Sequence, residues 1–180
     1  MCGIVGYIGS KKAEPILIDG LLRLEYRGYD SVGIATLENN KINLVKSKGR
    51  VNSLAENEEA QKLIGTLGIG HTRWATHGGV YKKNAHPHQC GNVTLVHNGI
   101  VENYRELIED YNLQSVLQSE TDTEVVAALM DMYYKGDAEE AIQRVVRKLK
   151  GTFALVMMFE DKPGVIYAIR NVSPIVVAKC

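Results

Sequence analysis

The chain opens Met1-Cys2-Gly3-Ile4-Val5-Gly6, an apolar run that is punctuated by glycines and follows a cysteine. Such a run predicts a short buried strand, over residues 2–9, to which backbone or a ligand can come close. The Cys2 side chain is small enough for an aminopeptidase to remove Met1. Removal would leave a thiol and a free α-amine on one residue. An α-amine, with a pKa of about 7.7–8.0, is a base that can activate the thiol. Cys2 is therefore the candidate catalytic centre; the alternative is a small hydrophobic residue in an edge strand.

Size and composition are those of one soluble globular domain: 180 residues, 45% hydrophobic and 23% charged. The 21 Lys and Arg residues balance the 21 Asp and Glu residues, so no nucleic-acid or membrane partner is predicted. No apolar stretch approaches about 18 residues, and no basic segment precedes the N-terminal run, which argues against a membrane span and a secretory signal. Three widely spaced cysteines favour a reducing compartment, so we expect a cytoplasmic location.

Hydrophobic periodicity divides the chain into strands and paired helices, with no linker or repeat. Hairpin-like neighbours near both ends predict mostly antiparallel sheets with helices packed outside them. Residues 75–91 lack periodicity and are expected to form a long binding loop or lid. The helix near residue 122 is expected to be capped by Ser119 or Thr121. Strands are predicted at 2–9, 32–37, 41–46, 66–73, 92–97, 152–159, 164–170 and 174–178, and helices at 13–26, 51–64, 102–111, 122–135 and 137–149.

Polar residues that follow the predicted strands could hold an amino-acid amide. Arg73 could direct two donors onto a carboxylate, and Asp122 could pair with an ammonium group. The Asn98 side-chain amide and the Gly99 backbone N–H could form a two-donor oxyanion hole. With Cys2 these parts predict acyl transfer from an amino-acid amide. Simpler alternatives stay open: an ion pair for Arg73, a helix-dipole interaction for Asp122 and a hairpin turn at Asn98-Gly99.

A metal site is the competing interpretation of the segment that holds His86, His88 and Cys90, because zinc binds these side-chain types. No second close pair of ligands accompanies them, and Pro87 stiffens the segment. We therefore expect these histidines to hydrogen-bond to loop backbone. No metal and no cofactor is predicted.

Seven blocks stand in the order of a known family: CGIVGYIG at 2–9, LEYRGYDSVGIA at 24–35, HTRWATHG at 71–78, NAHPH at 84–88, HNGIVENY at 97–104, SETDTE at 119–124 and LKGTFAL at 149–155. Through them the chain resembles the glutaminase domain of class II, or N-terminal nucleophile, glutamine amidotransferases. Trp74-Ala75 stands where the phosphoribosylamine-forming branch would be expected to show Tyr and Ser. That favours the sugar-aminating branch, the glutamine:fructose-6-phosphate aminotransferase (glucosamine-6-phosphate synthase) family.

The resemblance implies an α+β fold, the four-layer αββα sandwich of N-terminal nucleophile hydrolases. It implies that Cys2 is the nucleophile with its own α-amine as base, and that Asn98 and Gly99 form the oxyanion hole. Arg73 would hold the α-carboxylate of glutamine, and Asp122 its α-ammonium group. The further implied site residues are Thr76, His77 and His86 in the glutamine pocket, Trp74 as a closing residue that gates ammonia passage to the synthase domain, and Arg27 and Gly28 in the turn against the N-terminal residue.

The implied reaction is hydrolysis of L-glutamine to glutamate and ammonia through a Cys2 thioester, the ammonia-supplying half of glucosamine-6-phosphate synthesis. The implied partner is a sugar-isomerase domain that binds fructose-6-phosphate and lies outside these residues. We expect residues 1–180 to be a single glutaminase domain, truncated at the C-terminus. Val172 departs from the glycine that the family usually shows there. The alternative function is a non-catalytic fragment that binds glutamate or docks on an isomerase partner.

Overall fold

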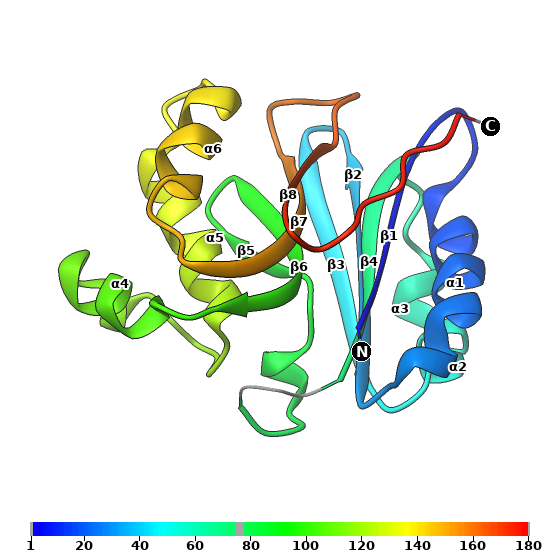
Figure 1. Ribbon diagram of the computed structural model, residues 1–180. Coiled ribbons are helices and arrows are strands. Elements are labelled where there is room, and N and C mark those ends of the chain that lie inside the picture. Colours follow the sequence, from blue (N-terminus) through cyan, green and yellow to red (C-terminus); the bar gives the residue numbers. More distant parts are fainter. Residues whose placement is uncertain (1, 75–77, 180) are drawn as a thin grey trace.

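Two four-stranded sheets stacked face to face form the centre of the computed structural model, which describes residues 2–74 and 78–179 (Figure 1). The first sheet has the strand order β1-β4-β2-β3 and the second β5-β6-β7-β8, and every neighbouring pair is antiparallel. Helices α1 to α3 lie on the outer side of the first sheet, and α4 to α6 lie on the outer side of the second. The predicted four-layer αββα sandwich is confirmed.

The described elements have the following bounds. The strands are β1 (Gly3–Ile8), β2 (Ser31–Glu38), β3 (Lys41–Lys48), β4 (Leu67–Arg73), β5 (His88–Cys90), β6 (Val93–Val101), β7 (Gly151–Phe159) and β8 (Tyr167–Asn171). The α-helices are α1 (Ala13–Leu24), α2 (Asn52–Ala55), α3 (Glu58–Gln61), α4 (Tyr104–Asp110), α5 (Asp122–Tyr133) and α6 (Ala138–Val146). Short 3₁₀ turns are η1 (Glu25–Arg27), η2 (Lys82–Asn84) and η3 (Leu113–Ser115).

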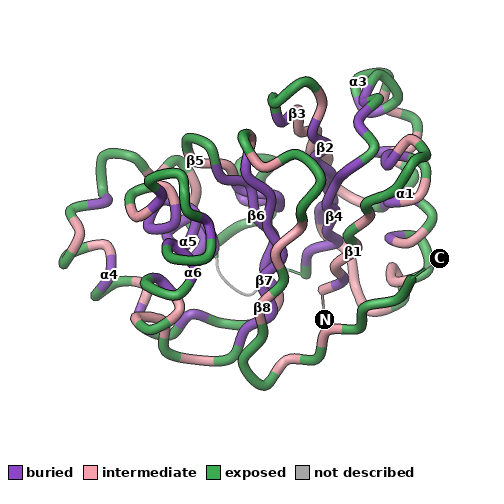
Figure 2. Tube along the Cα trace, turned by 90° about the horizontal axis from the view of Figure 1, so that it is seen from above, coloured by how far each residue is buried: buried purple, intermediate pink, exposed green. Residues whose placement is uncertain are grey.

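Apolar clusters fill the three spaces between the four layers. Leu17 and Leu21 of α1 pack on the first sheet, and α5 and α6 pack on the second. Between the sheets, Ile69 of β4 and Val96 of β6 belong to a third cluster. Figure 2 shows buried backbone along β2, β4 and β6, in the middle of the molecule. Burial of this apolar surface is the main favourable contribution to folding.

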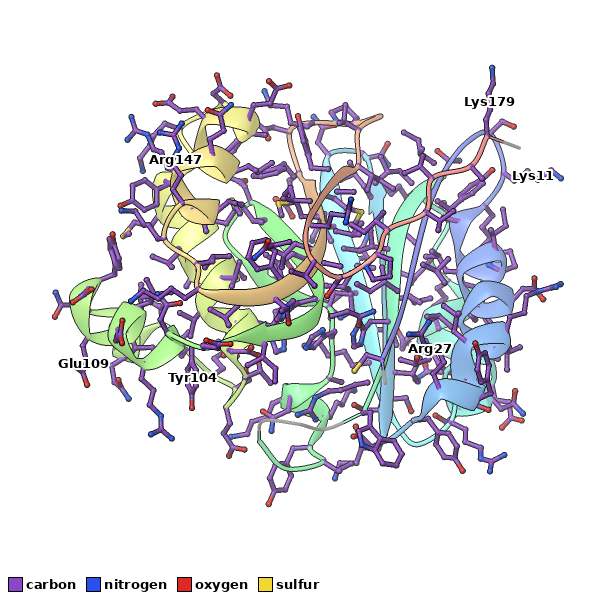
Figure 3. All side chains as sticks on the ribbon, in the orientation of Figure 1. Lys11, Arg27, Tyr104, Glu109, Arg147 and Lys179 are labelled. Atoms are coloured by element: carbon purple, nitrogen blue, oxygen red, sulfur yellow. The ribbon has the colours of Figure 1, made fainter. Side chains whose placement is uncertain are left out.

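Charged side chains at the ends of the layers point into solvent. Figure 3 shows Lys11, Glu109, Arg147 and Lys179 directed away from the sheets, and all four are exposed. No helix in residues 2–74 and 78–179 is long and apolar enough to cross a membrane.

The expected strand at 92–97 is longer than predicted, since β6 continues to Val101. Its last residues pair with the start of β7, where Val101 lies opposite Gly151. Asn98 and Gly99 therefore lie inside a central strand, neither in a hairpin turn nor at the start of a loop. The ladder with β7, which is distant in sequence, decides this boundary.

The N-terminal cap of α5 is Thr121, one of the two residues predicted. Its side chain accepts a hydrogen bond from the backbone N–H of Glu124 at 3.4 Å. The expected helix at 51–64 was wrong in extent, because α2 and α3 are separate short helices. Asn57 lies between them and caps α3 by accepting from the N–H of Glu59 at 2.9 Å.

Two further predictions were wrong at the level of secondary structure. Residues 174–178 form no strand: Pro174 lacks a backbone donor, and Val176 is 91% exposed. The described part of the segment 75–91 is not wholly irregular, because it contains η2 and the short strand β5. Pairing with β6 makes β5 a strand, and the local sequence contains no alternation that indicates it.

Candidate active site

The pairing of β1 with β4 places Cys2 beside the end of β4. Gly3 lies opposite Thr72, so the register brings Cys2 to Arg73 at the end of β4, and its thiol contacts the next residue, Trp74. The Trp74 backbone N–H donates to Cys2 Sγ at 3.2 Å, and the thiol donates to the Trp74 carbonyl at 3.6 Å. Burial raises the pKa of the Cys2 thiol, and the Trp74 N–H and the Arg73 charge act in the opposite direction. The thiol therefore needs a base in order to act as a nucleophile.

Gly28 provides the space that the Trp74 ring occupies. Its φ is +130°, and a Cβ built on it would lie 2.5 Å from Trp74 Cε3, so the position requires glycine. Trp74 itself is 53% exposed. Arg27 precedes Gly28 as the last residue of η1, which follows the end of α1 (Figure 3). The turn that was predicted to lie against the N-terminal residue thus contacts the tryptophan that holds the Cys2 thiol.

Asn98 of β6 approaches Cys2 from the second sheet. Its Nδ2 donates to the Cys2 carbonyl at 3.4 Å, and its Oδ1 lies 3.0 Å from His71 Nε2. Gly99 follows with a φ of +133°, and a Cβ there would clash with the carbonyl of Thr152. Asn98, the first residue predicted for an oxyanion hole, therefore contacts the candidate nucleophile, and the residue that follows it in β6 must be glycine.

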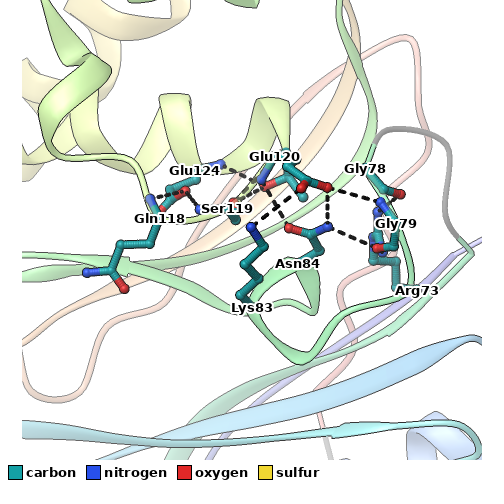
Figure 4. Close-up of polar contacts among 10 residues, drawn as sticks. Arg73, Gly78, Gly79, Lys83, Asn84, Gln118, Ser119, Glu120 and Glu124 are labelled. Atoms are coloured by element: carbon teal, nitrogen blue, oxygen red, sulfur yellow. Dashed lines mark hydrogen bonds and ion pairs between the residues drawn. The ribbon is translucent and has the colours of Figure 1, made fainter.

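The Arg73 side chain is buried, and its guanidinium group is held by carbonyl groups of the following loop. It donates from Nη1 to Gly79 O and from Nη2 to Gly78 O, each at 3.3 Å, and Nη1 lies 3.7 Å from Asp30 Oδ1 (Figure 4). The Arg73 carbonyl also accepts from the Asp30 N–H at 2.8 Å. The ion pair with Asp30 matches the simpler alternative for Arg73, and a guanidinium group at this position could also bind a carboxylate.

A polar network that the sequence reasoning missed ties this loop to the segment before α5 (Figure 4). The Glu120 carboxylate accepts from the Gly79 N–H at 3.2 Å and from Asn84 Nδ2 at 3.0 Å. In return, Asn84 Oδ1 accepts from the Glu120 N–H at 3.0 Å. These hydrogen bonds lower the pKa of Glu120. The signal available in the sequence was the presence of Asn84 in NAHPH and of Glu120 in SETDTE.

Asp122 lies two residues beyond Glu120, at the start of α5. Its Oδ2 accepts from the Val101 N–H at 2.8 Å, and its Oδ1 accepts from Thr123 Oγ1 at 3.4 Å. Asp122 is 6% exposed, and its Oδ2 lies 3.9 Å from His97 Nδ1. Asn98 lies on β6, and Val101 at the end of the same strand holds the Asp122 carboxylate at the start of α5. Strand β6 therefore positions both residues, one directly and the other through a hydrogen bond.

Four histidines are buried in one group between the sheets. The rings of His71 and His86 stack with centroids 4.1 Å apart, and His88 meets His86 edge-on at 5.0 Å. His86 Nδ1 accepts from the His97 N–H at 3.4 Å, and His88 Nε2 lies 3.0 Å from Thr121 Oγ1. Burial lowers the pKa of His71 to about 3 and holds the pKa values of His86 and His88 well below the usual range.

No cluster of three or more His, Cys, Asp or Glu side chains in the described residues could hold a metal ion. The zinc interpretation of His86, His88 and Cys90 therefore gains no support. These histidines were expected to bond to loop backbone; the backbone partner of His86 is His97, which lies in strand β6. Thr76 and His77, both predicted for the glutamine pocket, lie outside the described residues.

Comparison with known proteins shows the family to which the chain belongs. The model of the glutamine amidotransferase domain matches residues 72–178. The glutamine–fructose-6-phosphate aminotransferase (isomerizing) of Caldanaerobacter subterraneus subsp. tengcongensis is 54% identical over 184 residues, and the Clostridium tetani protein of that name is 49% identical over 180. Each comparison covers 98% of this chain, which spans 30% of the length of these curated relatives.

A solved structure shares the fold. It is glutamine phosphoribosylpyrophosphate amidotransferase from B. subtilis complexed with ADP and GMP, with a TM-score of 0.77 and 30% sequence identity, covering 89% of this chain and 35% of that one. The antiparallel sandwich thus belongs to the amidotransferase type. The chain is a member of the glutamine amidotransferase family, and it is an enzyme of that family.

Proposed function

We propose that residues 1–180 form a single glutaminase domain that hydrolyses L-glutamine and supplies ammonia for the synthesis of glucosamine-6-phosphate from fructose-6-phosphate. The family match and the two relatives named for this reaction support the proposal. The observation that carries it is the contact of Cys2 Sγ with the Trp74 N–H at 3.2 Å, with Asn98 Nδ2 3.4 Å from the Cys2 carbonyl. In the full-length enzyme a fructose-6-phosphate-binding isomerase domain would consume the ammonia, and the location would be cytoplasmic.

Each end of glutamine has an assigned partner in this proposal. Arg73 binds the α-carboxylate, and Asp122 binds the α-ammonium group, because each side chain carries the opposite charge. Thr76, His77 and His86 line the pocket. Trp74 closes it and gates ammonia passage to the synthase domain, and the turn at Arg27 and Gly28 supports the N-terminal residue.

The reaction begins when the α-amine of Cys2, free after Met1 is removed, takes the thiol proton. The thiolate attacks the amide carbon of glutamine, and the Asn98 side chain and the Gly99 N–H stabilise the oxyanion. The protonated α-amine of Cys2 returns the proton to the leaving nitrogen, so ammonia departs and a glutamyl thioester remains. Water then attacks the thioester through a second oxyanion, which releases glutamate and restores the thiol.

A glutaminase assay tests the proposal, with removal of Met1 verified by mass spectrometry. The processed wild-type protein should form glutamate and ammonia, whereas Cys2→Ala should give only background. A chain that retains an N-terminal extension is the matched control, because its thiol is intact and its base is lost; we expect it to be almost inert. Wild-type turnover no greater than that of Cys2→Ala would refute the proposal, and glutamate binding without turnover would favour a non-catalytic domain.

A further inference from the structure

The protonation of His71 follows from the two groups that its Nε2 contacts. His71 Nε2 lies 3.0 Å from the His97 carbonyl oxygen and 3.0 Å from Asn98 Oδ1. A carbonyl oxygen can only accept a hydrogen bond, so Nε2 carries a proton. The ring is fully buried, and burial lowers its pKa to about 3, so Nδ1 is unprotonated. Within the described residues Nδ1 has no hydrogen-bond partner.

This tautomer determines which way the Asn98 amide faces. The oxygen and nitrogen of an amide can exchange places by rotation, and only their partners distinguish the two orientations. Because His71 Nε2 is a donor, it accommodates Asn98 Oδ1 and not the Nδ2 group. The Nδ2 group is then left on the side of Cys2, where it donates to the Cys2 carbonyl at 3.4 Å. The opposite orientation would place two donors against each other at His71.

Packing keeps the His71 ring in the position that this hydrogen bond needs. His71 lies in β4 opposite Ile4 of β1 and Gly33 of β2. His86 stacks on its ring at 4.1 Å with an angle of 30° between the planes, and His86 Nδ1 accepts from the His97 N–H. The same His97 residue therefore anchors both rings, through its carbonyl and its N–H.

We propose that His71 is a positioning residue for glutamine hydrolysis: as a neutral Nε2–H imidazole it holds the Asn98 amide with its donor group toward the carbonyl that Cys2 attacks. The inference rests on the proposed glutaminase function. With the amide reversed, the developing oxyanion would meet Asn98 Oδ1, which repels it. His71 thus acts on catalysis through Asn98 and has no need to touch the substrate.

Three substitutions test this role by kinetics on the processed full chain. His71→Leu removes the donor, His71→Gln restores an N–H near the position of Nε2, and His71→Asn is the matched control whose amide reaches only the position of Nδ1. Losing an oxyanion-hole donor costs about 100- to 1,000-fold in kcat. We expect that loss for Leu and Asn, recovery to within about 10-fold of wild type for Gln, and KM values within about threefold. A His71→Leu kcat within about threefold of wild type, or equal kcat values for Gln and Asn, would overturn the inference.

A double-mutant cycle separates positioning from general damage to the fold. If His71 acts through Asn98, adding His71→Leu to Asn98→Ala should lower kcat no further than about twofold. Multiplied losses would instead show that the two residues act independently, and the inference would fall.

The tautomer itself can be measured without activity, by ¹⁵N NMR of the imidazole nitrogens. A neutral His71 with its proton on Nε2 is expected from pH 5 to 8. A proton on Nδ1, or an imidazolium, would overturn the inference. If the wild-type protein is inactive, the proposed function fails, and the NMR result still decides the state of His71.

Discussion

Strands β4 and β6 each begin with buried residues of the apolar core and continue into polar residues. Leu67 and Ile69 of β4 pack between the sheets, and the same strand ends in the buried segment 71–73, which reads His-Thr-Arg. In β6, Leu95 and Val96 are followed by His97 and Asn98. These residues are buried except Asn98, which is half-buried, so burial alone does not distinguish the apolar from the polar half of each strand.

The apolar half of each strand (Leu67 and Ile69 in β4, Leu95 and Val96 in β6) and its polar half (residues 71–73 in β4, His97 and Asn98 in β6) require different things from their neighbours. The apolar half needs only shape and volume, whereas a buried polar group costs free energy unless it is hydrogen-bonded. Around His71, Arg73 and Asn98 the structure supplies bonds from backbone carbonyls and side chains. Replacing buried charged groups by well-packed apolar residues of similar size is often neutral or stabilising. Stability of the fold therefore accounts for the apolar half of each strand, and the proposed reaction accounts for the polar half.

Of the changes considered, acid should have the largest effect on stability, and it should act through the histidines of the polar half. The unfolded chain binds protons at His71 near the usual pKa of 6.5, whereas the folded chain binds them only near 3, so the free energy of unfolding falls as the pH drops below about 6.5. At pH 5 His71 alone should cost about 2 kcal/mol, and His86 and His88 act in the same direction. Urea unfolding at pH 7.5 and pH 5.0 measures this. Equal stabilities at the two pH values would contradict it.

Ile69→Ala should damage the apolar half without touching the chemistry. Removing a fully buried isoleucine is expected to lower the free energy of unfolding by about 2–5 kcal/mol. Glutaminase kcat should stay within about twofold of wild type at a temperature where the variant is folded. Cys2→Ala is the control, because it should abolish activity and leave the unfolding midpoint nearly unchanged. A large loss of kcat in folded Ile69→Ala would contradict the prediction that the apolar half contributes only to stability.

Thr121→Ala should affect glutamine binding, whereas loss of the cap of α6, which lies away from the polar half, should not. Thr121 caps α5, next to Asp122, and Asp137 caps α6 by accepting from the Glu140 N–H at 3.0 Å. Either alanine substitution should cost about 1 kcal/mol in thermal unfolding. Only Thr121→Ala should raise KM for glutamine, by about three- to tenfold, because Asp122 loses its fixed position. The same KM for both variants would sink the idea.

Val172→Gly should give the smallest effect, a gain in stability outside both halves. Val172 has a φ of +69° and is 73% exposed, and a β-branched residue is strained in that conformation by about 1–2 kcal/mol. Allowing for the greater flexibility of unfolded glycine, we expect a gain of about 0.5–1 kcal/mol. Ser173→Gly is the control: Ser173 is not among the described non-glycine residues with positive φ, so it should show no gain. An unchanged midpoint for Val172→Gly would show that the turn carries no strain.

The sequence was a good guide where chemistry and local patterns coincide. Periodicity placed most strands and helices within a few residues, and the motifs that hold Cys2, Arg73, Asn98 and Asp122 predicted the candidate site. It was a poor guide where pairing with distant residues decides the outcome. The end of β6 depends on β7, and 174–178 looked like a strand because of its valines and yet has none of the pairing that a strand needs.

The amino-acid sequence by itself determined the family, the layered fold and the candidate nucleophile at Cys2, because these depend on residue types and their order. Only the tertiary structure decided how the polar groups meet. The network of Asn84 and Glu120, and the bond between His71 and Asn98, join segments that lie far apart in the chain. Hydrogen bonds depend on distance and direction, and only the packing of two sheets sets those for residues on different strands.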